Sequence, residues 1–284
     1  MANDMHQSAD NKIIPMTSVS SGKGREVRTD VYYYTNQIVN FVLVGDPAGG
    51  DWVLIDAGMP KSGSEILQAC EDRFGKGRKP SAIVLTHGHF DHVGSLVYLL
   101  EHWQVPVYAH PLEFPFLTGA QAYPEPDVTV EGGMLAKISS LYPNEPINVS
   151  MALRPLPEDG TVPFMPGWRW LPTPGHSPGQ VALFRDRDRT LISADAFITV
   201  KQDSFYKVLM QKEEVCGPPV YLTTDWPAAY ESVKKLAALQ PELVVPGHGT
   251  YMAGAELSTG LNNLVQNFQE LAVPDYGKFV RDKE

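Results

Sequence analysis

The alternation of apolar and polar positions predicts a first half built from short strands and helices. Four apolar runs of strand length, each bounded by turn-forming residues, occupy residues 38–44, 52–56, 82–85 and 105–109. Between the second and third runs, residues 61–74 carry apolar side chains at helical spacing, and a second helix is expected from Gly94 to about Glu101. Strands and helices therefore interleave over the first hundred residues.

The same pattern returns after residue 167. Strand-like apolar runs occupy residues 168–171, 181–184, 191–194 and 243–245. A helix is expected over about 226–239, with Pro227 at an N-terminal position, and a last helix begins near Gly254. Because the short strands interleave with helices but also occur in pairs, the pattern predicts a layered α/β sandwich rather than a barrel.

Two stretches lack this periodicity. Residues 111–167 are rich in proline, glycine and aromatic residues, and we expect an insertion there. Two interpretations stay open: a cap of short helices around a substrate pocket, or a packed surface insertion without a catalytic role. Residues 1–28 are polar and are expected to form a loose lead-in to a single domain of residues 29–284.

Composition and charge narrow the classes of function. The 284 residues are 43% hydrophobic and 20% charged, as in an ordinary globular enzyme, and the formal net charge of −10 disfavours nucleic acid as a partner. A small-molecule substrate is expected instead, and the oligomeric state is open. The N-terminal residues lack an apolar signal-peptide core and no segment approaches the length of a membrane span, so we expect a cytoplasmic protein without a membrane partner.

The densest group of chemically active residues is the segment 86–94, Thr-His-Gly-His-Phe-Asp-His-Val-Gly. It follows an apolar strand and precedes a helix, and its imidazoles and carboxylate are ligands for zinc and its first-row neighbours. His87 and His89 share one side of the chain because strand side chains alternate with a period of two. Where the chain turns, Asp91 and His92 can face a second position close by. The segment predicts a metal site.

This His-x-His-x-Asp-His pattern resembles the signature of the metallo-β-lactamase superfamily. Four further motifs resemble those of the superfamily and occur in its order: Asp56-Ala57-Gly58, the Thr-Pro-Gly-His-Ser-Pro-Gly run of residues 173–179, Ser193-Ala194-Asp195, and the Val-Pro-Gly-His-Gly run of residues 245–249. The resemblance extends from about residue 30 to residue 260. It implies a four-layer αββα sandwich.

The resemblance also implies a binuclear metal site. The first metal would be held by His87, His89 and His176, the second by Asp91, His92 and His248, and both would be bridged by Asp195. Two zinc ions are expected, with manganese or iron as alternatives. Asp91 would orient the attacking hydroxide between the metals and help a proton reach the leaving group. Asp56 would accept an N–H from a ligand imidazole rather than bind metal.

The full set of ligands resembles the glyoxalase II-like and lactonase-like hydrolases, which implies cleavage of an ester, lactone or thioester. The sequence departs from the signalling-lactone hydrolases at Ile198, where they usually carry a tyrosine. Tyr206 or Tyr221 could supply the missing oxyanion donor. Phe114 and Phe116 are the candidate apolar residues of a substrate pocket. The isolated histidines His6, His102 and His110 are expected to be structural.

A different class of enzyme stays open as an alternative. Persulfide dioxygenases also resemble this pattern, but they hold a single iron through the equivalents of His87, His176 and Asp195. Metal analysis with an oxygen-uptake assay would separate them from a binuclear hydrolase. A non-catalytic metal-binding protein is disfavoured, because an abandoned site would be expected to have lost at least one ligand and none is missing.

Overall fold

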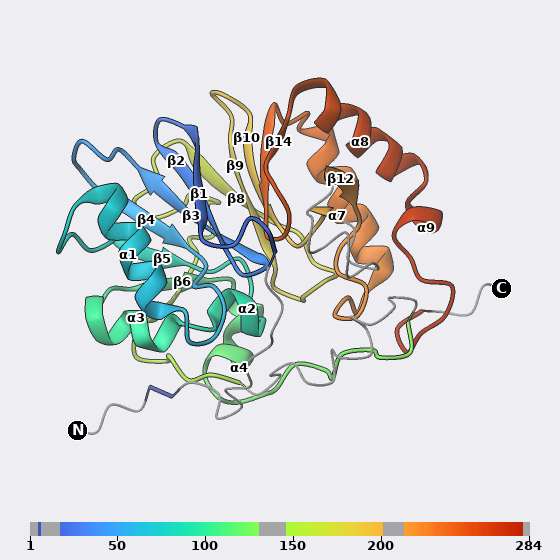
Figure 1. The fold of residues 1–284 in the computed structure, drawn as a ribbon. Coiled ribbons are helices and arrows are strands. Elements are labelled where there is room, and N and C mark those ends of the chain that lie inside the picture. The colour runs from blue at the N-terminus through green and yellow to red at the C-terminus, as the bar shows by residue number, and fades with distance from the viewer. Residues whose placement is uncertain (1–4, 7–17, 131–145, 201–212, 281–284) are drawn as a thin grey trace. The chain divides into compact units, whose positions relative to one another are not determined.

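The computed structural model describes residues 5–6, 18–130, 146–200 and 213–280, which group into two compact units. The first unit consists mainly of Ser20–Tyr123 and Pro143–Pro166. The second consists mainly of Gly167–Glu284, together with Pro124–Tyr142. Each unit is built around its own mixed sheet (Figure 1). The two are therefore described one after the other.

The sheet of the first unit has seven strands in the order in which they follow along the chain. They are β1 (Lys23–Arg28), β2 (Val31–Asn36), β3 (Val39–Gly45), β4 (Trp52–Ile55), β5 (Ala82–Val84), β6 (Val107–Ala109) and β7 (Leu153–Pro155). The pairs from β1 to β4 are antiparallel, and the pairs from β4 to β7 are parallel. The parallel half places the carboxyl ends of β4, β5 and β6 at one edge.

Helices α1 (Gly63–Phe74) and α3 (Leu96–Trp103) cover one face of this sheet (Figure 1). The apolar stripe of α1 packs on the strands through Ile66, Cys70 and Phe74, and the Phe74 ring stacks on Trp52 with a centroid distance of 4.2 Å. The shorter helices α2 (Phe90–Val93), η1 (Pro111–Glu113) and α4 (Phe114–Leu117) follow strand ends. The helices expected near residues 61–74 and 94–101 are confirmed.

The second unit contains a five-stranded sheet in the order β14-β13-β10-β9-β8. Its strands are β8 (Trp168–Pro172), β9 (Val181–Arg185), β10 (Thr190–Ala194), β13 (Leu243–Pro246) and β14 (Met252–Ala253). Strands β10 and β13 are parallel and the other pairs are antiparallel. A separate pair is formed by β11 (Ile198–Val200) and β12 (Glu213–Cys216).

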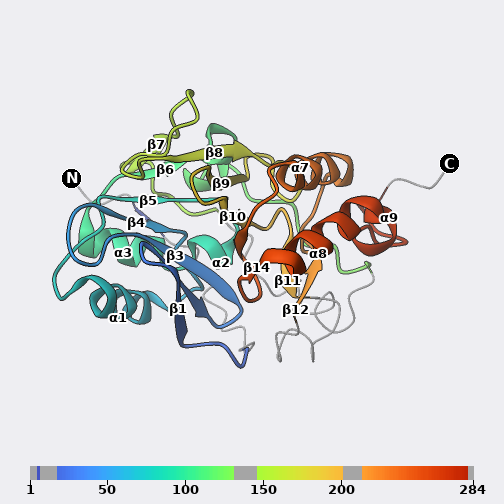
Figure 2. The same cartoon turned by 90° about the horizontal axis from the view of Figure 1, so that it is seen from above.

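In the described part of the second unit, this sheet is covered by α7 (Trp226–Ala238), α8 (Gly254–Gln266) and α9 (Phe268–Leu271). Figures 1 and 2 both show α7 and α8 side by side. Their apolar stripes, including Val233 and Leu261, join buried strand residues such as Phe184 and Val244 in one core. The apolar spacing that predicted these helices therefore marks the faces that pack on the sheet.

No helix in the described parts of the chain is long and apolar enough to cross a bilayer. Among the described residues of the second unit, the longest helices, α7 and α8, have 13 residues each, whereas a transmembrane helix needs about 20 apolar residues.

The N-terminal stretch is more regular than expected. Strand β1, Lys-Gly-Arg-Glu-Val-Arg, lies inside residues 1–28 and pairs with β2 at the edge of the first sheet. Its side chains are largely exposed, so no apolar alternation revealed it. Residues 1–4 and 7–17 lie outside the described residues, and the division into a lead-in and one domain stays a prediction.

The expected insertion of residues 111–167 contributes to the first sheet. Within it, η1 and α4 follow β6, and β7 pairs with β6 in parallel. The strand has three residues and ends in Pro155, so it carried no recognisable strand pattern. Residues 131–145 lie outside the described residues. The described part of this stretch is therefore partly scaffold, and a cap around the substrate stays a prediction.

Candidate metal centre

The predicted ligands of the first unit follow the carboxyl end of a parallel strand. Strand β5 ends at Val84, which pairs with Ile55 of β4, so the residues that follow the two strands lie at the same edge. Asp56 follows β4, and the Thr86–His89 loop follows β5. In open α/β sheets, ligands bind outside the carboxyl ends of the strands.

Four ligand-type side chains are buried in this loop and the short helix α2: His87, His89, Asp91 and His92. The ring of His87 lies 4.7 Å from that of His89 and 4.2 Å from that of His92, measured between centroids. Ligand atoms of Asp91 and His92 lie within 4.8 Å of each other. Burying so many polar groups in one place costs free energy unless they form hydrogen bonds or coordinate a metal ion.

Asp56 organises two of these histidines. Its Oδ1 accepts from the Thr86 backbone N–H and its Oδ2 from the Thr86 hydroxyl, both at 2.8 Å. The same Oδ2 lies 2.8 Å from His92 Nδ1. Since a carboxylate only accepts, His92 carries its proton on Nδ1 and keeps the Nε2 lone pair for a metal.

The tautomer of His87 is set in the same way, through Thr86. The Thr86 hydroxyl gives its proton to Asp56, so its oxygen accepts from His87 Nδ1 at 3.1 Å. His87 therefore also presents Nε2 as its ligand atom. Buried supporting contacts of this kind fix the orientation of metal-binding imidazoles. They are the contacts expected if Asp56 supports the ligands instead of binding metal.

The predicted ligands of the second unit surround one carboxylate oxygen. Asp195 follows β10 and His248 follows the parallel strand β13, where Ala194 pairs with Pro246, and His176 lies in the loop between β8 and β9. Asp195 Oδ2 is 3.4 Å from His176 Nε2 and 3.3 Å from His248 Nε2. All three side chains are buried.

The protonation of His176 is set by Thr223. The Thr223 hydroxyl donates to the Pro219 carbonyl at 2.8 Å, so its oxygen accepts from His176 Nδ1 at 3.1 Å. His176 Nε2 then faces Asp195 Oδ2 with a lone pair, and both atoms are acceptors. A cation or a second proton on the ring would relieve their repulsion.

The donor set fits a transition metal. Ligand atoms about 2.0–2.2 Å from a tetrahedral metal lie about 3.3–3.6 Å apart, which matches both distances at Asp195 Oδ2. Imidazole and carboxylate together suit zinc and iron. Among the described residues, histidine and aspartate side chains form buried groups whose ligand atoms lie within 4.8 Å of one another and could hold a metal ion. These groups include every predicted ligand: His87, His89, Asp91, His92, His176, Asp195 and His248.

The predicted substrate-binding residues have packing roles in the structure. Phe114 is half-buried against the core of the first unit, and Phe116 is buried with its ring 3.8 Å from that of Tyr123. Tyr221 is buried in the second unit, where its carbonyl accepts from the Asp127 N–H at 2.8 Å. Tyr206 lies outside the described residues. Contact of these residues with substrate stays a prediction.

The isolated histidines of the first unit take part in local structure. His102 is exposed on α3, with Nδ1 3.2 Å from the Tyr98 carbonyl. His110 Nδ1 accepts from the Leu112 N–H at the start of η1, and burial lowers the pKa of His110. The backbone N–H of His6 donates to the Asn148 carbonyl at 3.0 Å. These contacts agree with structural roles.

Two further residues beside the Thr86–His89 loop, the candidate metal-binding loop, were not anticipated from the sequence. Glu113 and Tyr123 are buried, and both contact the backbone of Gly88. Glu113 comes a few residues after β6, at the same sheet edge as the loop. That position was the available signal, but it lay in a stretch without periodicity. Thr223 likewise carried no signal.

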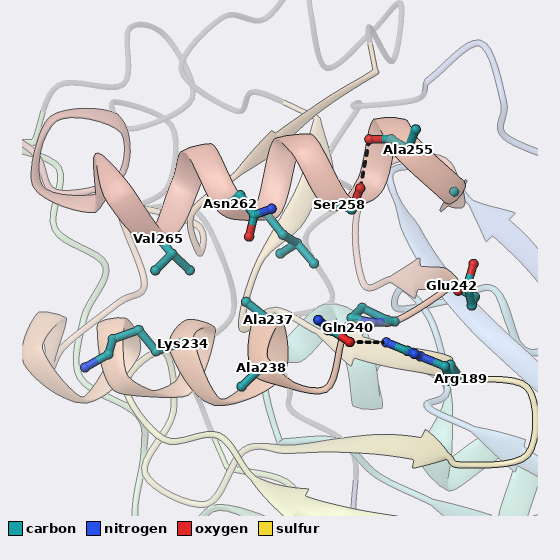
Figure 3. A pocket seen from close by; sticks show the side chains of 13 residues that line it. Arg189, Lys234, Ala237, Ala238, Gln240, Glu242, Ala255, Ser258, Asn262 and Val265 are labelled. Atoms are coloured by element: carbon teal, nitrogen blue, oxygen red, sulfur yellow. Dashed lines mark hydrogen bonds between the residues drawn. The ribbon is translucent and has the colours of Figure 1, made fainter.

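A separate hollow of about 720 Å³ lies between α7 and α8 (Figure 3). Arg189 and Lys234 line it, but none of the predicted metal ligands does. Figure 3 shows the Arg189 guanidinium directed at the Gln240 side chain, to which it donates at 3.1 Å, and Lys234 donates to Glu231 at 2.9 Å. Because none of the predicted ligands lines it, the hollow is not part of the candidate metal centre.

Comparison with known proteins places these features in a family. The family model described as "Metallo-beta-lactamase superfamily" matches residues 34–248, which contain every predicted ligand. "Probable metallo-hydrolase YflN" of Bacillus subtilis (strain 168) is 45% identical over 259 residues, covering 91% of this chain and 98% of that protein. "Hydroxyacylglutathione hydrolase" of Mesorhizobium japonicum (strain LMG 29417 / CECT 9101 / MAFF 303099) is 27% identical over 218 residues, covering 76% of this chain and 65% of that protein.

Solved structures agree with the family match. TTHA1623 in a di-iron-bound form is 33% identical, covers 76% of this chain and 89% of its own, and has a TM-score of 0.51. A B3 metallo-beta-lactamase with an active-site glutamic acid is 16% identical, covers 90% and 91%, and has a TM-score of 0.61, which shows the fold alone. The expected fold class, the α/β metallo-β-lactamase fold predicted as a four-layer αββα sandwich, is confirmed, with two mixed sheets flanked by helices.

Proposed function

The chain belongs to the metallo-β-lactamase superfamily, with metallo-hydrolases among its relatives, and from this premise we propose that it is a binuclear hydrolase of an ester, lactone or thioester. The observation that carries the proposal is the position of Asp195 Oδ2, 3.4 Å from His176 Nε2 and 3.3 Å from His248 Nε2. One carboxylate oxygen between two imidazole nitrogens is the arrangement expected of a bridging ligand.

A bound cation explains this arrangement better than a second proton. Thr223 holds the His176 proton on Nδ1, which leaves the Nε2 lone pair facing the carboxylate. The separation of the two atoms matches neighbouring ligands of one metal. The family match also favours metal at these positions.

The ligand sets of both units are assigned to the same pair of ions. In this assignment His87, His89 and His176 would hold the first ion, Asp91, His92 and His248 would hold the second, and Asp195 would be shared by both. The assignment is supported by the order of the motifs along the chain and by the family model, which spans both ligand sets.

Zinc and iron are the leading candidates for the metal, with manganese as a further alternative. Imidazole nitrogen dominates the donor set, which suits zinc. TTHA1623 has been solved in a di-iron-bound form, which supports iron as an alternative for this relative of it. Sulfur ligands play no part in the assignment, since neither Cys70 nor Cys216 belongs to a group of ligand-type side chains among the described residues.

The protein's own groups hold and move protons around the reacting atoms. When bound, the metal pair supplies a nucleophilic water at neutral pH and polarises the substrate carbonyl. Asp91, buried on the first turn of α2, would orient the attacking water and pass its proton towards the leaving group. Asp56, Thr86 and Thr223 keep the ligand imidazoles in the tautomer that presents Nε2.

The proposed substrate class rests on the resemblance of the ligand set. The full complement of histidine and aspartate ligands resembles that of glyoxalase II-like and lactonase-like enzymes, and the similarity to a hydroxyacylglutathione hydrolase supports a thioester among the candidates. Tyr221 is the candidate oxyanion donor among the described residues. Tyr206, which lies outside them, is the second candidate. Phe114 and Phe116 are assigned to the apolar side of the pocket.

The test combines elemental analysis with a substrate panel. Purified protein should contain close to two transition-metal ions per chain and should hydrolyse at least one of a lactone, a thioester and an aryl ester more readily than a phosphodiester. Asp195→Ala should lose metal from both sites, whereas Asp186→Ala, in the exposed turn that follows β9, should retain it.

One outcome would replace the proposal by the alternative enzyme class. A single tightly held iron, with oxygen uptake on a persulfide and no hydrolysis, would identify a mononuclear dioxygenase. Full metal content in Asp195→Ala would contradict the bridging assignment.

A further inference from the structure

We propose that Glu113 and Tyr123 are positioning residues for the metal-binding loop: they fix the peptide at Gly88 and thereby aim His87 and His89. This inference rests on the proposed function, because it concerns the ligands of the first metal. It gives these two residues, which lie at the start of the expected insertion, a role in supporting the metal ligands rather than in covering the substrate or in packing alone.

The contacts converge on one backbone amide. The Gly88 N–H donates to Glu113 Oε2 and to Tyr123 Oη, each at 2.9 Å. The Tyr123 hydroxyl in turn donates to the same Glu113 Oε2. Glu113 is fully buried, and hydrogen bonds to a buried carboxylate are stronger than those between neutral groups. The carboxylate, the phenol and the amide therefore form one closed network.

Gly88 leaves room for this network, and its backbone freedom is what the network restrains. A Cβ at Gly88 would lie 2.9 Å from Tyr123 Oη and 3.2 Å from Leu117 Cδ2, so any larger residue would push the phenol away. Glycine is also the residue with the greatest backbone freedom. Because Gly88 separates His87 from His89, an unrestrained peptide there would let the two imidazoles turn independently. The two bonds to its N–H remove that freedom.

Tyr123 also contacts a predicted ligand directly. Its ring centroid lies 4.3 Å from that of His89, with the two ring planes tilted by 50°, and Phe116 stacks on it at 3.8 Å. His89 is thus confined by the phenol ring beside it as well as by its own backbone. The ring contacts from Phe116 through Tyr123 to His89 link α4 to the loop, and this explains the burial of Phe116 without requiring it to touch substrate.

The first test measures the loop itself in the protein as purified. Hydrogen–deuterium exchange of peptides covering residues 85–94 should be faster in Glu113→Gln and in Tyr123→Phe than in the parent. Matched controls on α3, Glu101→Gln and Tyr98→Phe, alter exposed side chains and should leave exchange unchanged. Tyr123→Phe removes only a hydroxyl, so it carries the test if Glu113→Gln does not fold.

The second test measures metal binding and turnover. Supporting residues around metal ligands typically contribute about 10–100-fold in metal affinity or activity, so chelator competition should show a loss of this order for the first metal in both variants. The d–d absorption bands of the cobalt-substituted protein should shift in both variants, since they report ligand geometry. At saturating metal, kcat should fall with little change in KM.

The outcomes separate the two proposals. If the parent holds two metals and hydrolyses ester or thioester while exchange, affinity and cobalt spectrum of both variants match the parent, the positioning role is wrong and the hydrolase stands. If the parent holds no metal and hydrolyses nothing, the proposed function is wrong, and exchange at residues 85–94 still reports whether the network fixes the loop.

Discussion

Asp56 Oδ2 lies 2.8 Å from His92 Nδ1, although the two residues are 36 positions apart in the chain. Both side chains are buried. Asp56 has a positive φ of 62°, which is uncommon for a residue other than glycine. A backbone conformation of that kind persists only where the surrounding contacts hold it. Here the hydrogen bonds of the Asp56 carboxylate to Thr86 and His92 hold it.

Asp56→Asn should weaken binding of the second metal without preventing folding. The amide has the size of the carboxylate but only one acceptor oxygen, so it cannot serve both Thr86 and His92. We expect a loss of about 10–100-fold in metal affinity, measured by chelator competition. Asp46→Asn, at an exposed turn, is the matched control. Unchanged affinity in Asp56→Asn would mean that Asp56 does not orient His92.

Thr223→Val should weaken binding of the first metal. Valine has nearly the shape of threonine but offers no oxygen to His176 Nδ1, so the imidazole can turn or take the other tautomer. We expect about a tenfold loss of affinity, at the low end for a group that supports a ligand. Thr224→Val, the adjacent half-buried threonine, should bind metal as the parent does. Equal effects of the two substitutions would point to loop stability instead.

Asp91 and His248 should differ once both metal sites are filled. Asp91 is assigned proton transfer as well as metal binding, whereas His248 is assigned only the second role. At saturating metal, Asp91→Asn should lose about 10²–10⁴-fold in kcat, the usual range for a general acid–base group. His248→Ala should recover more of its activity.

Metal content must be measured in each variant of this comparison, because lost occupancy would mimic lost chemistry. Parent-like turnover by Asp91→Asn with both sites filled would reduce Asp91 to a ligand.

Phe116→Ala separates packing from substrate contact. The ring is buried on Tyr123, so its removal should lower the free energy of unfolding by about 3–5 kcal/mol, measured by urea denaturation. If Phe116 also lines the pocket, KM should rise more for long-chain or aromatic substrates than for short ones. Phe114→Ala, at a half-buried position, should cost less stability and report more directly on the pocket. An equal change in KM for all substrates in both variants would assign these rings to packing alone.

The local features of the protein were predictable from the sequence. Apolar spacing placed the helices that became α1 and α7, because the residues that pack on a sheet recur with the helical period. The ligand types of the first unit lie within six consecutive positions, so one strand end and one helical turn bring them together. The fold class followed from the same pattern and from the motifs.

The supporting residues required the tertiary structure. Asp56 reaches His92 because β4 and β5 are parallel, and Glu113 reaches Gly88 because β6 ends at the same edge. Thr223 reaches His176 across 47 positions. Strand β1 was missed because its exposed side chains carry no apolar alternation. Hydrophobic periodicity records which side chains are buried, but hydrogen bonds between distant residues depend on strand order and register, which only the folded chain decides.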